Sequence, residues 1–127
     1  MSRALNDLSA RFRPLAMELL ARCVEEQIAV VIVDTLRTPA EHAENLAKGV
    51  SWTTRSRHLD GDAIDICPYS TWDAHGPDKL NWNAGDPVWL RLGVIGESIG
   101  LRWGGRWKVK DLGHFEYVER AVPDQAA

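Results

Sequence analysis

The sequence has few cysteines, no long hydrophobic run and no excess of positive charge. Its two cysteines, Cys23 and Cys67, are too few for a disulfide framework, and we expect two buried thiols. The longest apolar run, Ile28 to Val33, is far too short to cross a bilayer, so we expect no membrane insertion. Fifteen Lys and Arg against eighteen Asp and Glu give a net charge of -3, without a basic tract for phosphates. Nucleic acid is therefore a poor candidate partner.

The first twelve residues also lack the apolar segment and the small-residue cleavage site of a secretory signal, so we expect synthesis in the cytoplasm. With 127 residues, 45% of them hydrophobic and 26% charged, the chain has the size and composition of one globular domain. We expect a monomer with a single domain over residues 1–127, in which residues 119–127 form a flexible tail.

Helical periodicity and capping residues predict three helical regions. Apolar residues recur at spacings of three and four from Leu5 to Cys23, where Pro14 divides the segment in two. The capping-box segment Thr38-Pro39-Ala40-Glu41 begins a second helix, which we expect to end at Lys48. A third helix is predicted after Asp86-Pro87, and ends before Gly100.

Three segments have the character of strands. The β-branched run that starts at Ile28 predicts a strand buried on both faces. Residues 101–103 and 114–118 predict two further short strands, and residues 69–85 have the composition of a long surface loop. Helices placed before and between a few strands indicate a compact α+β domain.

Two clusters carry residues suited to metal chemistry. In the first, His58 lies seven residues before Asp65, an odd separation that would place the two side chains on opposite faces of a flat strand. The chain must bend for both to reach one ion, and Gly61 supplies that bend. Ala63 shares a face with Asp65 and leaves room beside the carboxylate.

The second cluster runs from Trp103-Gly104-Gly105-Arg106-Trp107 to Asp111-Leu112-Gly113-His114-Phe115-Glu116. A catalytic zinc site uses three nitrogen or oxygen ligands from the protein and keeps a position for water. His58, Asp65 and His114 would make such a set. Asp111 and Glu116 are both placed to act as the base, and Glu116 could instead orient a ligand.

Other residues have a second interpretation beside the functional one. Trp103 and Trp107 either wall a substrate cleft or pin the loop to the core. Cys67 shares the face of Asp65 but is expected to be a buried thiol rather than a ligand. The acidic residues Asp60 and Asp62 either sharpen metal affinity or, as we expect, are solvated loop residues, and His42 and His75 are expected at the surface.

The strings S-x-H-x-x-G-x-A-x-D (Ser56 to Asp65), W-G-G-x-W and D-x-x-H-F-E resemble zinc peptidases of the VanX and VanY type, within the D-Ala-D-Ala carboxypeptidase superfamily. Among these, the chain is most similar to the short L-alanyl-D-glutamate endopeptidases of phage endolysins, and the resemblance covers roughly residues 28–118. It implies a small antiparallel sheet that carries the zinc site with helices packed against it, the fold shared with the hedgehog signalling domain.

The resemblance also implies roles for single residues. His58, Asp65 and His114 hold one zinc ion, Asp111 is the catalytic acid and base in preference to Glu116, Arg37 stabilises the transition state and Ser56 contacts substrate. The implied substrate is the peptidoglycan stem peptide, cut in the periplasm during host lysis, which a chain without an export signal reaches with a holin. Two alternatives stay open: a D-Ala-D-Ala carboxypeptidase or dipeptidase, and a non-catalytic zinc-stabilised module that binds cell wall.

Overall fold

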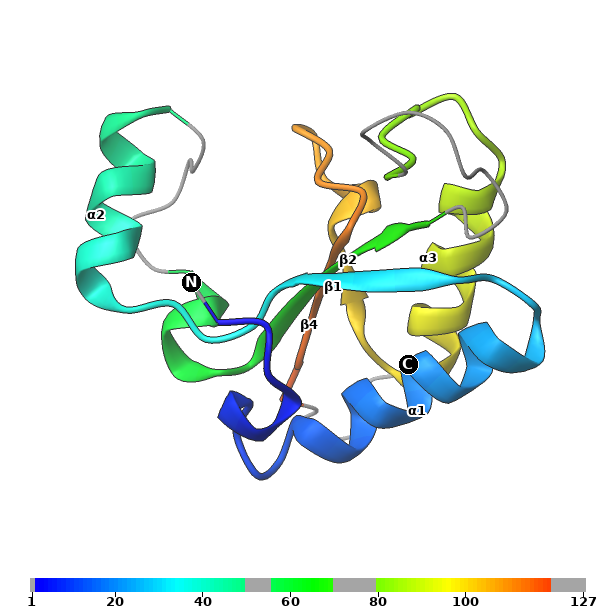
Figure 1. The fold of residues 1–127 in the computed structure, drawn as a ribbon, viewed down its shortest axis with the longest axis horizontal. Helices are drawn as coiled ribbons and strands as arrows, with labels where there is room; N and C mark the ends of the chain where they lie inside the picture. Colours follow the sequence, from blue (N-terminus) through cyan, green and yellow to red (C-terminus); the bar gives the residue numbers. More distant parts are fainter. Residues whose placement is uncertain (1, 50–55, 70–79, 120–127) are drawn as a thin grey trace.

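The computed structural model describes residues 2–49, 56–69 and 80–119, which form a four-stranded sheet with helices against it (Figure 1). In chain order the elements, with 3-10 helices written η, are η1 (Leu5–Asp7), α1 (Arg13–Glu25), β1 (Val30–Asp34), α2 (Pro39–Ala47), η2 (Arg57–Asp60), β2 (Ala63–Pro68), α3 (Val88–Ile99), β3 (Arg102–Trp103), η3 (Gly104–Arg106) and β4 (His114–Glu116). The predicted α+β class with a small antiparallel sheet is confirmed.

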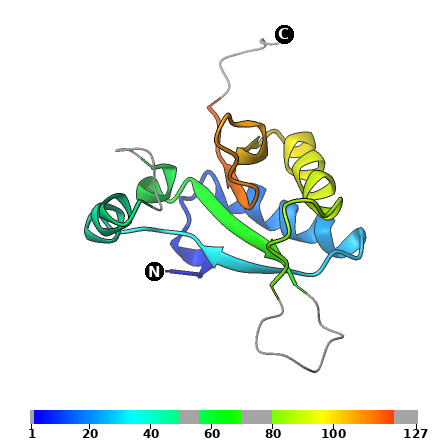
Figure 2. The same cartoon turned by 90° about the horizontal axis from the view of Figure 1, so that it is seen from above.

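The strands lie in the order β1-β2-β4-β3, and each neighbouring pair is antiparallel. Helices α1 and α3 lie together on one side of this sheet, whereas α2 stands apart from them (Figure 2). Side chains alternate between the two faces of a strand. Ile64, Ile66 and Phe115 therefore point into the core under α1 and α3, and Asp65 and His114, which are paired in register, point to the other face.

The N-terminal helical segment divides near Pro14, as predicted. Pro14 lies in the first turn of α1, where its missing N–H costs no hydrogen bond. Phe12, Leu19 and Cys23 are buried and belong to the hydrophobic core. Cys23 and Cys67 are both buried free thiols, which confirms that prediction.

The capping box of α2 is present. The Thr38 hydroxyl accepts a hydrogen bond from the Glu41 amide at 3.1 Å, and the Glu41 carboxylate accepts one from the Thr38 amide at 2.9 Å. At the start of α3, Asp86 accepts a hydrogen bond from the Val88 amide at 2.9 Å. The predicted beginnings of both helices are therefore confirmed.

Strand β1 differs from its prediction. It lies at the edge of the sheet and pairs only with β2, and its residues Val30 to Val33 are partly exposed rather than buried on both faces. A run of β-branched residues indicates a strand but does not say how many neighbours the strand has. The register shifts between Ile32 and Asp34, and this irregularity brings Asp34 opposite Asp65.

Some predictions fall on residues that the structure does not describe. Residues 70–79 of the predicted loop, including His75, and residues 120–127 of the predicted tail lie outside the described ranges. Within those ranges, none of the helices combines the length and the apolar character needed to span a bilayer.

Candidate metal and catalytic site

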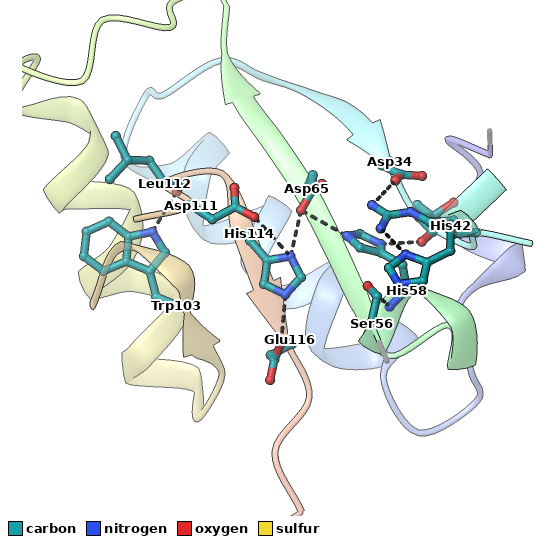
Figure 3. Close-up of polar contacts among 12 residues, drawn as sticks. Asp34, His42, Ser56, His58, Asp65, Trp103, Asp111, Leu112, His114 and Glu116 are labelled. Atoms are coloured by element: carbon teal, nitrogen blue, oxygen red, sulfur yellow. Dashed lines mark hydrogen bonds and ion pairs between the residues drawn. The ribbon is translucent and has the colours of Figure 1, made fainter. Parts of the chain in front are cut away.

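Three side chains from separate parts of the sequence meet on the side of the sheet away from the hydrophobic core. His58 comes from η2, Asp65 from the middle of β2 and His114 from the first position of β4. One ligand atom from each residue lies within 4.8 Å of the others, and the Asp65 carboxylate is placed between the two imidazoles (Figure 3). The structure thus brings together the three residues that the sequence analysis selected as metal ligands.

His58 is held in one orientation by the turn around it. Gly61 ends η2 with φ of 74°, in the left-handed region, and so turns the chain between His58 and β2. The Ser56 hydroxyl accepts a hydrogen bond from the His58 amide at 3.1 Å. Because a carbonyl can only accept, the 2.6 Å contact with the Thr35 carbonyl assigns the proton of His58 to Nδ1.

This tautomer leaves a lone pair on His58 Nε2. That atom lies 3.1 Å from Asp65 Oδ1, yet it is buried and has no hydrogen-bond partner in the described part of the chain. A buried nitrogen without a partner is costly, so such an atom indicates a missing ligand or a functional role. A metal ion between His58 and Asp65 would satisfy it.

His114 is contacted on both ring nitrogens. Its Nδ1 lies 3.0 Å from Asp65 Oδ1, and its Nε2 lies 2.8 Å from Glu116 Oε1. The second Glu116 oxygen is 3.3 Å from Arg102 and 3.8 Å from Arg57. Glu116 therefore lies on the side of the imidazole away from Asp65, where it can orient the ring.

The residues present fit a divalent metal ion. Two imidazole nitrogens and one carboxylate oxygen are the donor set of many catalytic zinc sites. In both histidines the other ring nitrogen contacts an oxygen, the Thr35 carbonyl for His58 and the Glu116 carboxylate for His114. Such contacts fix the orientation of metal-binding histidines. The Thr35 contact was not predicted, because a backbone carbonyl leaves no signal in the sequence.

The electrostatics of the site follow from these contacts. Burial opposes ionisation of Asp65, but the hydrogen bond with the adjacent His114 imidazole holds its pKa well below the usual range. Burial likewise opposes the charged form of His114, but hydrogen bonds with Asp65 and Glu116 raise its pKa to about 10. In the metal-free protein, a proton on His114 thus stabilises the carboxylates that surround it.

Asp111 lies beside this group on the loop that leads into β4. Its carboxylate is 4.0 Å from His114 Nδ1, and its side chain is 41% exposed, so water can reach it. Burial raises the pKa of Asp111, and the negative charge of Asp65 adds to this effect. A raised carboxyl pKa suits a group that must accept and then release a proton.

The position of Asp111 depends on a close approach to Gly104. The Asp111 amide donates to the Gly104 carbonyl at 3.0 Å. A Cβ at position 104 would lie 2.4 Å from the Asp111 carbonyl oxygen, so only glycine fits there. The Trp103 indole donates to the Leu112 carbonyl at 2.7 Å and fastens the same loop from below (Figure 3).

The two tryptophans of this segment take different places. Trp103 is 4% exposed and belongs to the core, so of its two predicted roles the structure shows the one that pins the loop. Trp107 is half-buried, and its ring centroid lies 5.1 Å from that of His114. Trp107 is therefore the one that borders the metal-ligand group.

Arg37 lies between β1 and α2 with a side chain that is 12% exposed. Its guanidinium donates to Asp34 at 2.9 Å and contacts His42 Nδ1 at 3.2 Å. His42 is buried at 3% exposure, so its predicted place at the surface is wrong. Ser56, the predicted substrate contact, is also buried and caps η2.

Asp60 and Asp62, both predicted to be solvated loop residues, differ in their exposure. Asp62 is not a solvated loop residue: it is 1% exposed and accepts hydrogen bonds from Ser9 at 2.5 Å and from Arg11 at 2.6 Å. It ties the N-terminal segment to the loop after η2. Asp60 is exposed, as expected. Cys67 is outside the metal-ligand group, and its thiol contacts the Pro68 and Asn81 carbonyls.

Comparison with known proteins gives consistent matches. Residues 49–117 match the peptidase family described as D-alanyl-D-alanine carboxypeptidase. The L-alanyl-D-glutamate peptidase of Escherichia phage T5 is 30% identical over 124 residues, which covers 91% of this chain and 85% of the relative. That of Listeria phage A118 is 31% identical over 107 residues, or 81% of this chain and 35% of the longer relative.

A solved structure shows the same fold. The crystal structure of the Serratia marcescens L-Ala D-Glu endopeptidase ChiX matches 90% of this chain and 83% of its own length, with a TM-score of 0.70 and 24% sequence identity.

Proposed function

The chain belongs to the D-alanyl-D-alanine carboxypeptidase family of peptidases, and we propose that it is a zinc-dependent peptidoglycan endopeptidase that cuts the L-alanyl-D-glutamate bond of stem peptides. The observation that carries this proposal is the group of His58, Asp65 and His114 with Asp111 beside it. The bond specificity is supported by the names of the two phage relatives. Their origin supports a role as a phage or prophage endolysin.

We assign the ion to His58 Nε2, Asp65 and His114 Nδ1, the atoms that face one another in the site. Bound zinc supplies a Lewis acid that makes water acidic enough to react near neutral pH. Glu116 and the Thr35 carbonyl hold the two imidazoles in the orientation in which they would bind such an ion.

Asp111 is the proposed general base and acid. Its exposed carboxylate takes the proton of the attacking water and delivers a proton to the leaving amine. Glu116 is the weaker candidate for this role, because it is buried and lies on the side of His114 away from Asp65. Its two oxygens already contact His114 and arginine side chains.

Arg37 is the proposed stabiliser of the negative charge that develops on the peptide oxygen. A fixed guanidinium next to such a charge is worth about 3 to 4 kcal/mol, by analogy with other oxyanion donors. We propose Trp107 as a wall of the substrate cleft, since it lies against His114. Ser56 remains a proposed substrate contact.

Two other functions make different predictions. A D-Ala-D-Ala carboxypeptidase, the activity in the family's description, would release D-alanine from the free end of the stem peptide. A non-catalytic zinc-binding module would bind cell wall without cutting it. Such a module would not require the Asp111 side chain, because Asp111 belongs to neither the metal-ligand group nor the hydrophobic core.

The proposed activity can be tested with purified sacculi and the zinc-loaded protein. We expect new amino groups to appear with time, and Asp111→Ala to abolish them while it binds zinc and sacculi as the wild type does. If the wild type releases no amino groups but still binds zinc and sacculi, the chain is a binding module.

A further inference from the structure

We propose that Asp34 and His42 are positioning residues that fix the orientation of the Arg37 guanidinium. This inference rests on the role of Arg37 in the proposed function. It assigns a purpose to a buried histidine that the sequence pattern placed at the surface.

The first support is that both terminal nitrogens of Arg37 have a partner. One terminal nitrogen, Nη2, donates to Asp34 Oδ2 at 2.9 Å, and the other, Nη1, contacts His42 Nδ1 at 3.2 Å. Asp34 and His42 are each 3% exposed. A guanidinium with a separate partner on each terminal nitrogen has a defined plane, whereas one ion pair would allow it to rotate.

The contact with His42 also defines the state of that histidine. Arginine has only donors, so His42 Nδ1 must supply a lone pair to accept from Nη1. His42 is therefore neutral in this contact, with its proton on Nε2. A neutral acceptor at Nη1 orients the guanidinium without adding a second negative charge to that of Asp34.

The second support is the connection between this cluster and the metal ligands. The Arg37 amide donates to the His58 carbonyl at 3.0 Å, and His58 Nδ1 donates to the Thr35 carbonyl. Asp34 is the register partner of Asp65 across β1 and β2. The residues that hold Arg37 are therefore tied to the same short segments as two of the proposed ligands.

The two partners of Arg37 come from different elements, and this gives its side chain a rigid position. Asp34 is the last residue of β1 and His42 lies in the first half of α2, so Arg37 is held by both regular elements that flank its own loop. A catalytic donor must keep its position to within a fraction of an ångström to act on the transition state.

We would test the proposal by steady-state kinetics on a soluble stem peptide. His42→Leu removes the acceptor at similar volume, and we expect kcat to fall about tenfold, or ~1.4 kcal/mol, with KM and zinc content unchanged. His42→Asn places an amide oxygen near the position of Nδ1 and should recover most of the activity. Glu44→Leu alters an exposed residue of the same helix and should have no effect.

A double-mutant cycle shows whether the effect passes through Arg37. On an Arg37→Met background, His42→Leu should cause no further loss, because there is no guanidinium left to orient. An equal fractional loss on both backgrounds would overturn the proposal, as would a His42→Leu enzyme with wild-type kcat. If His42→Leu does not fold, Asp34→Asn takes its place in the same cycle with the same expected outcomes.

A spectroscopic measurement separates this inference from the proposed function. In the wild-type protein, the guanidinium N–H signals of Arg37 should be sharp and exchange slowly with water, and His42→Leu should broaden them. If the wild type cuts no peptide but these signals behave as expected, the function is wrong and the positioning is right. Signals unchanged by His42→Leu would overturn the positioning.

Discussion

Glu116 Oε1 lies 2.8 Å from His114 Nε2, on the ring edge opposite the one that faces Asp65. The carboxylate thus accepts the Nε2 proton and leaves Nδ1 for the metal. Contacts of this kind change metal affinity by about 10- to 100-fold. We expect Glu116→Ala to weaken zinc binding by that factor, measured by competition with a chelator. Glu97→Ala, at a surface pair with Arg106, is the control, and equal zinc affinity in all three proteins would contradict the assignment.

Replacement of Asp111 separates chemistry from metal binding. Asp111→Asn keeps the size of the side chain but removes the group that accepts a proton, so kcat/KM should fall by about 10²- to 10⁴-fold. Zinc stoichiometry should stay at the wild-type value, because Asp111 is outside the ligand group. Loss of zinc together with activity would indicate that Asp111 is a ligand instead.

Much of the fold follows from local signals in the sequence. The capping box at Thr38 and the apolar spacing after Asp86 depend on residues within one or two turns, and both helices begin where these patterns indicate. The bend at Gly61 also follows from local geometry, since His58 and Asp65 cannot meet without it. Such features are encoded in neighbouring residues.

The parts that could not be predicted depend on distant contacts. A single histidine between the acidic residues of a helix carries no clear sign of burial, and His42 is placed by its contact with Arg37 on the preceding loop. Asp62 is buried because Ser9 and Arg11 approach from the N-terminal segment. The edge position of β1 likewise depends on the order of the strands, which no single segment contains.

The loop that carries Asp111 should be sensitive to a single methyl group. In Gly104→Ala the new Cβ would meet the Asp111 carbonyl at 2.4 Å, so the loop must shift. Overpacking of this kind costs about 1 to 3 kcal/mol, and we expect both a lower Tm and a lower kcat. In Gly85→Ala the nearest atom would be 3.5 Å away, so that variant should match the wild type. Equal Tm and kcat in the two variants would show that the close approach of Gly104 to Asp111 does not matter for stability or activity.

Asp62 and Asp60 provide a matched pair for stability. Asp62→Ala leaves the Ser9 hydroxyl and the Arg11 guanidinium without their buried partner, and loss of such a partner costs about 1 to 3 kcal/mol. Asp60 is exposed, so Asp60→Ala should change the free energy of unfolding far less. Urea unfolding of both variants measures the two losses of stability. A larger loss in Asp60→Ala than in Asp62→Ala would contradict this prediction.

The metal-free protein should lose stability as the pH rises above neutrality. Although burial opposes it, the contacts of His114 with Asp65 and Glu116 raise its pKa to about 10, whereas an unfolded imidazole titrates near ~6.5. The folded form thus binds the extra proton between these values, and its contribution is complete below ~6.5 and lost as the pH approaches about 10. Urea unfolding at both ends of this window should show the decrease in the wild type and a smaller one in His114→Gln. Equal decreases would contradict the assignment.

The most direct test of the central claim is mass spectrometry of the fragments that the zinc-loaded protein releases from peptidoglycan. We predict fragments with a new N-terminal D-glutamate and a glycan-linked L-alanine with a free carboxylate. Release of free D-alanine or of D-alanyl-D-alanine, without a new D-glutamate terminus, would contradict the proposed endopeptidase activity.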